Sequence, residues 1–448
     1  ALNGSGPAPA AFSADALRQR GHQTMPTAEA EAVTLPGAVA LFDRLASEHG
    51  RLGLARCLEP AIRKAEAGVP VAPRTAWDWA RLAGHLQGRA RDLYLTSGAA
   101  PPAGTVFRAP FLAEVMRRIA RDGAPGFYTG EVAGDMARSL AAAGGAHTER
   151  DFAAVTCDGA TPIAGHYRDL ELVEHPPNGQ GATAILMAKI LAHFDIAALA
   201  PGGAERTHLE AEAAKLAYDA RDRFIADPAA TSRLDHMLSD ETAARLAALI
   251  DPARAGPDLP ARAGAVHRDT VYLTVVDRDR MAVSLIYSIF HGFGSGLASD
   301  RFGIVFQNRG AGFTLAPGHP NEAGPGKRPM HTIIPAMLRR AGRVIMPFGV
   351  MGGPYQPAGH VRVMSNIADF GMDPQAAIDA PRSFPQNGAL EIERGHDPEV
   401  RASLAAMGHD VTTPEAPLGG AQAILIDEAA GVLIAGSDPR KDGCAIGL

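Results

Sequence analysis

The pattern of hydrophobic and polar positions changes character near residue 265. Before that point helical spacing dominates: apolar residues recur every three to four positions through Thr207–Ile225, which predicts an amphipathic helix. The segment Phe111–Gly123 shows the same spacing and ends on a glycine, as helices often do. Gly181–Asp195 is apolar on nearly all sides, so we expect a buried helix there.

After residue 265, short runs rich in β-branched and aromatic residues predict strands. The predicted strands are Thr270–Asp277, Ala282–Ser288, Gly303–Phe306, Val344–Phe348, Ala389–Glu393, Ala421–Ile426 and Gly431–Ala435. Short helices are expected near 359–371, 374–380 and 398–406, the last two opened by Asp373-Pro374 and Asp397-Pro398 as N-cap and first-turn pairs. This order predicts an α/β layered protein whose strands pair across both halves, not two independent domains.

Composition narrows the function. The net charge of the 448 residues is −6, which gives a nucleic-acid partner no electrostatic support. Three widely spaced cysteines and sixteen histidines without metal-ligand spacing predict neither disulfides nor a metal, and no cofactor motif is present. The longest uncharged stretch, Met281–Ser299, turns polar and glycine-rich, so no membrane span is expected. The chain opens on Ala-Leu-Asn without a signal pattern; we expect a fragment of a longer chain and favour the cytoplasm over the periplasm.

A proline- and glycine-rich segment, residues 251–269, delivers the chain onto the predicted strand that begins with Thr270. One interpretation is a surface loop that enters a hairpin. The other is a processing site that leaves Thr270 as a new N-terminus. Its hydroxyl would then attack a carbonyl while its α-amine, with an ordinary pKa of about 7.7–8.0, takes the proton.

Two further segments could carry chemistry. Gly352 and Gly353 follow a strand and precede a helix, so their N–H groups could form an oxyanion hole; a tight turn is the alternative. Lys327, Arg328 and His331 lie close together in "GPGKRPMHT" and could bind an anionic substrate, although such a cluster also suits a solvated loop.

Together these motifs resemble one family. The order "DTVYLTVVDRDRMAVS", "FGSG", "FQNRGAGF", "GPGKRPMHTIIP", "GVMGG" and "GSDPRKDG" is similar to that of the γ-glutamyltransferase family, and "HLEAEAAKLAYDARDRF" extends the likeness into the first half. The resemblance implies an autoprocessed N-terminal-nucleophile (Ntn) hydrolase with a four-layer αββα sandwich. It implies a large-subunit region, residues 1–269, that lacks the family's first segment, and a small-subunit region, 270–448, the two forming one composite domain.

The resemblance also implies roles. Thr270 matches the nucleophile, with cleavage between Asp269 and Thr270; Ser288 matches a supporting hydroxyl; Gly352 and Gly353 match the oxyanion-hole glycines. The two fragments of the precursor would remain associated, and the partner would be a small-molecule amide.

The departures from the family pattern concern the glutamyl site. Where the family has an arginine motif that binds the glutamyl carboxylate, this chain has Asn3 to Ser5 and the residues after them. The positions of the family's two α-amine ligands hold Phe290 and Gly312, and the position of its serine pair holds His331-Thr332. This pattern is similar to that of the family's oxamate amidohydrolases. We therefore expect a small carboxylate-bearing amide as substrate, with binding residues among Phe290, Arg309, Lys327, His331 and Thr332. The alternatives are a glutathione hydrolase or transferase with a rebuilt glutamyl site, and an inactive member that serves as a binding module.

Overall fold

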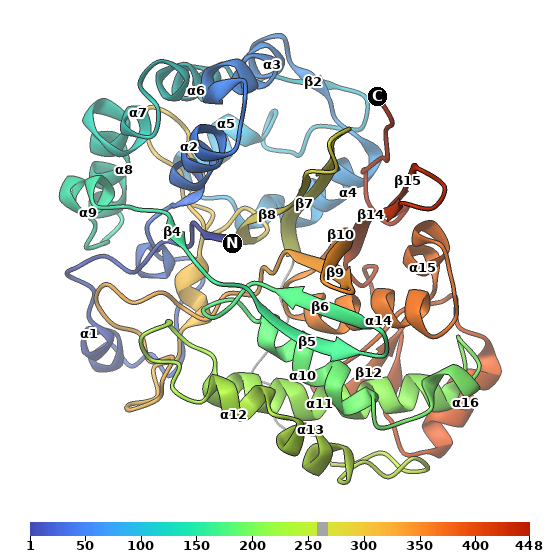
Figure 1. Cartoon of the computed structure of the whole chain (residues 1–448). Helices are drawn as coiled ribbons and strands as arrows, with labels where there is room; N and C mark the ends of the chain where they lie inside the picture. Colours follow the sequence, from blue (N-terminus) through green and yellow to red (C-terminus); the bar gives the residue numbers. More distant parts are fainter. Residues whose placement is uncertain (258–267) are drawn as a thin grey trace. The chain divides into compact units, whose positions relative to one another are not determined.

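The structure is a computed structural model that describes residues 1–257 and 268–448 (Figure 1). Its contacts divide the chain into two compact units, each formed by two segments. The first unit comprises Ala1–Ala160 with Ile289–Pro329, and the second comprises Thr161–Ser288 with Met330–Leu448. Among the described residues, no helix is long and apolar enough to cross a membrane.

The first unit is mostly helical. Its α-helices are α1 (Ala14–Gln19), α2 (Ala38–Glu48), α3 (Gly53–Ala67), α4 (Pro73–Leu82), α5 (Gly88–Tyr94), α6 (Pro110–Asp122), α7 (Pro125–Tyr128), α8 (Gly130–Ala142) and α9 (Glu149–Ala153). Short strands pair as β1 (Leu2–Asn3) with β4 (Asp158–Gly159) and as β2 (Val69–Pro70) with β3 (Val106–Phe107). The predicted amphipathic helix is α6, and Gly123 follows it with a φ of 67°, as expected of a C-terminal glycine.

The second unit is built on a six-stranded antiparallel sheet with the strand order β15-β14-β10-β9-β6-β5. The strands are β5 (Ile163–Tyr167), β6 (Leu170–Glu174), β9 (Ala336–Arg340), β10 (Arg343–Met351), β14 (Gly420–Asp427) and β15 (Val432–Ser437). A separate hairpin joins β7 (Arg268–Val276) to β8 (Ala282–His291). A smaller sheet contains β11 (Ser383–Gln386), β12 (Ala389–Ile392) and β13 (Val411–Thr412).

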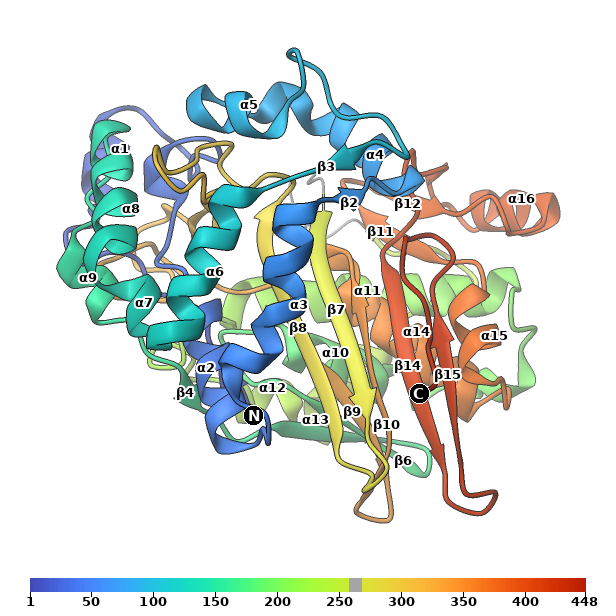
Figure 2. The same cartoon turned by 90° about the horizontal axis from the view of Figure 1, so that it is seen from above.

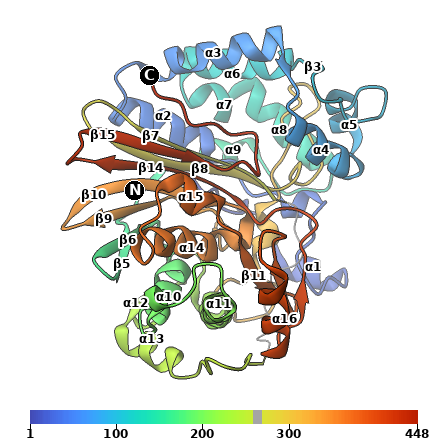
Figure 3. The ribbon, with the colours of Figure 1, turned by 90° about the vertical axis from the view of Figure 1, so that its right-hand side faces the viewer.

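Helices cover one face of the six-stranded sheet, and the β7–β8 hairpin packs on the other (Figure 3). The covering helices are α10 (Gly181–Leu191), α14 (Gln356–Ala368) and α15 (Pro374–Asp379), and α11 (Ala204–Phe224) packs on α10. The unit also holds α12 (Leu234–Leu238), α13 (Asp240–Ala247) and α16 (Pro398–Ala406). Neighbouring residues of β10 point to opposite faces of the sheet. Val350 contacts Gly359 of α14 on one face, and Gly349 lies against the ring of Tyr272 from β7 on the other. Helix α10 is buried over almost its whole length, as its apolar sequence predicts.

Several predicted elements are corrected. No strand forms at Gly303–Phe306, where Val305 makes only an isolated bridge with Ala298. Phe302 and Phe306 are instead buried in a cluster with helical residues, and Gly303 has a φ of 60°, which does not suit a strand. None of the strands of the first half, β1 to β6, was predicted, although β6 alternates buried and half-buried residues. In the second half, β9, β11 and β13 were not predicted either.

The helix predicted at 359–371 begins earlier, at Gln356, and ends at Ala368. Of the two aspartates, Asp373 caps its helix by accepting a hydrogen bond from the Ala376 N–H, whereas the Asp397 side chain makes no capping bond.

The sheet joins segments from either side of residue 270, because β6 pairs with β9. The boundaries of the compact units fall elsewhere, at residues 160, 288 and 329. The predicted large-subunit region 1–269 and small-subunit region 270–448 are defined by the cleavage site and not by compactness, so this division stays a prediction.

Candidate active site

Thr270 is the third residue of β7 and is half-buried. Its Oγ1 donates a hydrogen bond to the Oγ of Ser288, at 3.1 Å, so the two predicted hydroxyl residues meet across the hairpin. Most of the predicted linker, residues 258–267, lies outside the described part of the chain. The pair has the geometry that a nucleophile and a supporting hydroxyl require.

The hairpin is fixed to β10 by a second hydroxyl pair. The Tyr272 hydroxyl and the Ser284 Oγ lie 2.8 Å apart, and Ser284 donates to the carbonyl of Phe348 at 3.3 Å. The Tyr272 ring occupies the space beside Gly349, where a Cβ would lie 2.4 Å from the ring. Burial raises the pKa of Tyr272, so its hydroxyl stays protonated and bonded. This packing holds β7 at one height on the sheet.

The N-terminal end of β7 and the C-terminal end of β10 lie at the same end of these layers. Arg280, in the β7–β8 turn, donates to the carbonyl of Gly431 in the β14–β15 turn, so both turns lie together at the opposite end. Met351, which ends β10, pairs with Gly420, which begins β14. Figure 2 shows β7 starting at the end where β14 starts. Thr270 and the turn after Met351 therefore share one end of the second unit.

That turn contains Gly352 and Gly353, both with positive φ, at 130° and 58°. A Cβ on Gly352 would lie 2.8 Å from the Cα of Gly419, so the position accepts only glycine without movement. Gly353 opens a short 3-10 helix, η5 (Gly353–Tyr355), that leads into α14. N–H groups at a helix start have no intrahelical acceptor, which suits them to an oxyanion.

Three residues that the sequence interpretation missed hold this turn. The Gln180 Nε2 donates to the carbonyl of Gly353 at 3.0 Å, and the Tyr218 hydroxyl donates to the carbonyl of Pro354. Arg221 donates to the Oε1 of Gln180 at 2.9 Å. Gln180 lies in none of the quoted motifs. Tyr218 and Arg221 lie in the family-like segment "HLEAEAAKLAYDARDRF", but neither its helical spacing nor the resemblance gave them a role in the site.

His331 and Thr332 lie in the same unit and are buried. The His331 N–H donates to the carbonyl of Asn178 at 2.7 Å, and its carbonyl accepts from the Gln180 N–H at 3.0 Å. The Thr332 carbonyl accepts from the Gln180 side chain at 2.7 Å. Gln180 thus connects this predicted substrate-binding segment with the glycine turn.

The remaining predicted binding residues belong to the first unit. Arg309 is buried, with its guanidinium carbon 4.2 Å from the centre of the Phe290 ring. Burial lowers the pKa of Arg309 to about 9, which leaves the side chain a cation at neutral pH. Phe290 is two residues beyond Ser288 in β8 and has a φ of 76°, unusual for a residue with a side chain.

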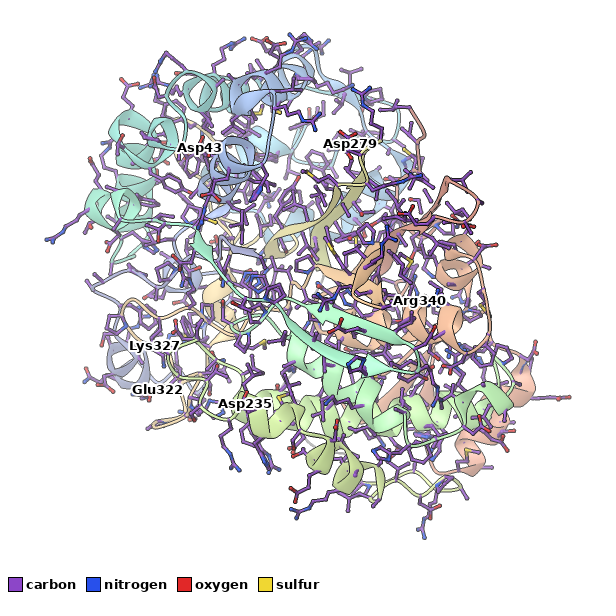
Figure 4. The ribbon with its side chains drawn as sticks, viewed as in Figure 1. Asp43, Asp235, Asp279, Glu322, Lys327 and Arg340 are labelled. Atoms are coloured by element: carbon purple, nitrogen blue, oxygen red, sulfur yellow. The ribbon has the colours of Figure 1, made fainter. Side chains whose placement is uncertain are left out.

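Lys327 has a local role in the first unit. Its ammonium donates to the carbonyls of Pro320 and Glu322, at 3.1 and 2.6 Å, and Figure 4 shows Lys327 beside Glu322. These bonds close the loop on which it stands. Arg328 likewise donates to the carbonyl of Ser5 and to the Asp158 carboxylate, both at 2.6 Å. These contacts give Lys327 and Arg328 partners within the first unit, and the role of Lys327 in substrate binding stays a prediction.

One group among the described residues could hold a metal ion: His208, Glu212 and His409, all buried. The two imidazoles are bonded to each other at 2.8 Å, and His208 also bonds the carbonyl of Asp251. Glu212 accepts from Lys215 and from the Gly256 N–H. These partners account for the arrangement as a hydrogen-bonded anchor for residues 251–256.

Comparison with known proteins decides the family. The sequence model of the family described as Gamma-glutamyltranspeptidase matches residues 1–448. The chain belongs to this family. It is therefore an enzyme of the Ntn-hydrolase class, and the alternative of an inactive binding module is set aside.

Among its gamma-glutamyltranspeptidase relatives, the glutathione hydrolase-like YwrD proenzyme of Bacillus subtilis is 34% identical over 429 residues, 93% of this chain and 81% of the relative. The oxamate amidohydrolase proenzyme of Klebsiella pneumoniae is 34% identical over 409 residues, 88% of this chain and 76% of the relative. The crystal structure of cephalosporin acylase from Bacillus halodurans superposes with a TM-score of 0.92 at 36% identity, covering 99% of this chain and 83% of the acylase. The predicted Ntn-hydrolase fold, the αββα sandwich, is confirmed by this likeness.

Proposed function

We propose that this family member is an autoprocessed N-terminal-threonine amidohydrolase that hydrolyses a small carboxylate-bearing amide such as oxamate. The observation that carries the proposal is the Thr270–Ser288 hydroxyl pair at the start of β7. It lies at the end of the second unit where β10 leads into the two positive-φ glycines. A nucleophile and an oxyanion-binding turn are the two parts that acyl transfer requires.

Processing comes first in the proposed sequence. The Thr270 Oγ1 attacks the carbonyl carbon of Asp269, the peptide C–N bond breaks, and an ester replaces it. Water then hydrolyses the ester, which leaves a carboxylate on Asp269 and a free α-amine on Thr270. Several relatives are named proenzymes, in keeping with such a step. The two fragments stay associated because β6 and β9, from either side of the cut, pair in one sheet.

Turnover uses the new amine. It accepts the proton of the Thr270 hydroxyl as the oxygen attacks the substrate carbonyl, and the Gly352 and Gly353 N–H groups bind the resulting oxyanion. The proton passes to the leaving nitrogen, which departs as ammonia from a primary amide. Water then attacks the acyl-enzyme ester and releases the acid.

The substrate class rests on the altered glutamyl site. Where the resemblance expects charged or amide ligands for the glutamyl α-amine, the chain has Phe290 and Gly312. Each lost charge-assisted hydrogen bond would weaken γ-glutamyl binding by about 1.5–3 kcal/mol. A small acid amide needs one cationic partner for its carboxylate, and the motif similarity to the family's oxamate amidohydrolases makes Arg309 a candidate for that partner. The similarity to an oxamate amidohydrolase points the same way.

A second candidate is hydrolysis of a larger amide, as in a glutathione hydrolase or an acylase. Its support is the equal identity to the glutathione hydrolase-like relative and the structural likeness to a cephalosporin acylase.

Steady-state rates on oxamate, a γ-glutamyl anilide and a cephalosporin distinguish these candidates. We expect oxamate to be hydrolysed fastest, the anilide slowly, and no acceleration by acceptor dipeptides. Rapid turnover of the anilide or of the cephalosporin would replace the oxamate assignment by the corresponding candidate.

A further inference from the structure

Gln180 connects two segments of the candidate site through one side-chain amide. It is fully buried, and its two N–H donors go to the carbonyls of Thr332, at 2.7 Å, and Gly353, at 3.0 Å. The amide oxygen accepts from Arg221 at 2.9 Å, and this contact determines which end of the amide faces the two carbonyls. A primary amide is the side-chain group that can donate twice and accept in this arrangement.

The position of Gln180 in its own helix gives it no local use for that side chain. It is the N-cap of α10, where Ser, Thr, Asp and Asn stabilise a helix by accepting from the first turn. The Gln180 side chain makes no such bond. Its amide is directed instead at residues more than 150 positions away in the chain.

The glycine turn is held through its carbonyls. The Gly352 carbonyl accepts from the Tyr355 N–H, and the Pro354 carbonyl accepts from the Tyr218 hydroxyl. The Gly353 carbonyl accepts from the Gln356 N–H at the end of η5 and from the Gln180 side chain. In a trans peptide the N–H points opposite to the C=O of the preceding residue, so fixing the Gly352 carbonyl fixes the Gly353 N–H. The Gly353 carbonyl belongs to the peptide bond before Pro354, and proline has no N–H group. The hydrogen bond from Gln180 therefore holds the turn without occupying the Gly352 or Gly353 N–H, the two proposed oxyanion donors.

We propose that Gln180 is a positioning residue that sets the orientation of the Gly352–Gly353 turn and its spacing from the His331–Thr332 segment. This role rests on the proposed function, in which the turn binds the oxyanion and the segment contacts the substrate. Tyr218 acts on the same turn, and Arg221 holds the Gln180 amide in place. These hydrogen bonds should stabilise the transition state more than the substrate complex, because the oxyanion forms only in the transition state.

The test compares Gln180→Met, which keeps the volume and removes all hydrogen bonds, with Gln180→Glu, which keeps the acceptor for Arg221 but has no N–H. Rates of oxamate hydrolysis are normalised to the cleaved fraction measured by mass spectrometry. We expect kcat to fall about tenfold or more in both variants, with KM changed less than about threefold, because loss of one oxyanion donor costs about 10²–10³. Tyr218→Phe should lower kcat as well, and less than additively with Gln180→Met, since both act on one turn.

Gln375→Met is the matched control. The Gln375 amide also bridges, donating to the Ser437 carbonyl and accepting from its N–H, but it contacts neither segment of the site. It should lower thermal stability without changing kcat. A kcat for both Gln180 variants equal to that of the control, or a loss confined to KM, would overturn the role of Gln180. Activity that survives Thr270→Ala would overturn the proposed function itself, whichever result the Gln180 variants give.

Discussion

At Gly349 a single hydrogen atom stands where any other residue would place a side chain. The ring of Tyr272 fills that space, and a Cβ would come within 2.4 Å of it. Because Tyr272 and Thr270 lie on the same strand two residues apart, this contact also sets the height of the nucleophile on the sheet.

Gly349→Ala should therefore destabilise the protein by about 1–3 kcal/mol, the usual cost of an overpacked core, and lower amidase activity with it. The free energy of unfolding in urea measures the change. Gly202→Ala is the control, since a Cβ there meets no atom within 4 Å. Equal stability of the two variants would show that the Tyr272 ring moves aside at no cost.

The two glycines of the turn carry a second prediction at this scale. Gly353→Val should lower kcat by about 10²–10³, because a β-branched residue is strained at a φ of 58° and would displace an oxyanion donor. Substrate KM should change little. If the purified variant folds and keeps wild-type kcat, these glycines form only a turn.

At the scale of elements, α11 is joined to the segment after α16 by the hydrogen bond between His208 and His409. Burial lowers the pKa of His409 to about 4, with smaller effects from the Lys215 charge and from His208. The folded protein therefore holds this imidazole neutral, whereas the unfolded chain protonates it near its usual pKa of about 6.5.

Since the unfolded state binds more protons between about pH 6.5 and 4, stability should be complete above that window and fall as the pH is lowered through it. The contribution is roughly 3 kcal/mol at most. Thermal unfolding from pH 7 to 4 measures it, with His409→Gln as the comparison. The slope with pH should be shallower in the variant; identical slopes would mean that His409 does not titrate in this way.

The elements that the sequence predicted best are those whose own composition determines them. The β-branched runs of β7, β10 and β14 were predicted within a few residues, and the all-apolar α10 was expected to be buried and is. The hairpin β5–β6 was missed because its outward positions carry His and Glu, which weaken the strand signal. The strand expected at Gly303–Phe306 failed because its one aromatic residue, Phe306, and the preceding Phe302 are buried in a cluster with helical residues of the same unit.

For the whole molecule, the site was predictable where the chemistry demands particular residue types. A threonine after a proline-rich segment and adjacent glycines after a strand could be recognised, as could the order of the family's motifs. Gln180, Tyr218 and Arg221 could not, because their role arises from contacts between segments far apart in the chain. Periodicity along one helix carries no information about which distant carbonyl a side chain will meet.

The account as a whole depends on Thr270 becoming an N-terminus. In the uncut chain its nitrogen is part of the Asp269–Thr270 peptide bond and cannot serve as the base, so cleavage must precede turnover. Thr270→Ala should give one uncut, folded and inactive chain, since the same hydroxyl serves both reactions. Thr270→Ser should still cut, but more slowly, because the hydroxyl remains without the methyl group that restrains its rotamer.

Intact mass spectrometry of the purified wild-type protein, combined with an amidase assay on the same sample, is the most direct test. The account predicts two masses, those of Ala1–Asp269 and Thr270–Leu448, that co-purify and hydrolyse the amide. A single chain of 448 residues with full amidase activity would contradict it.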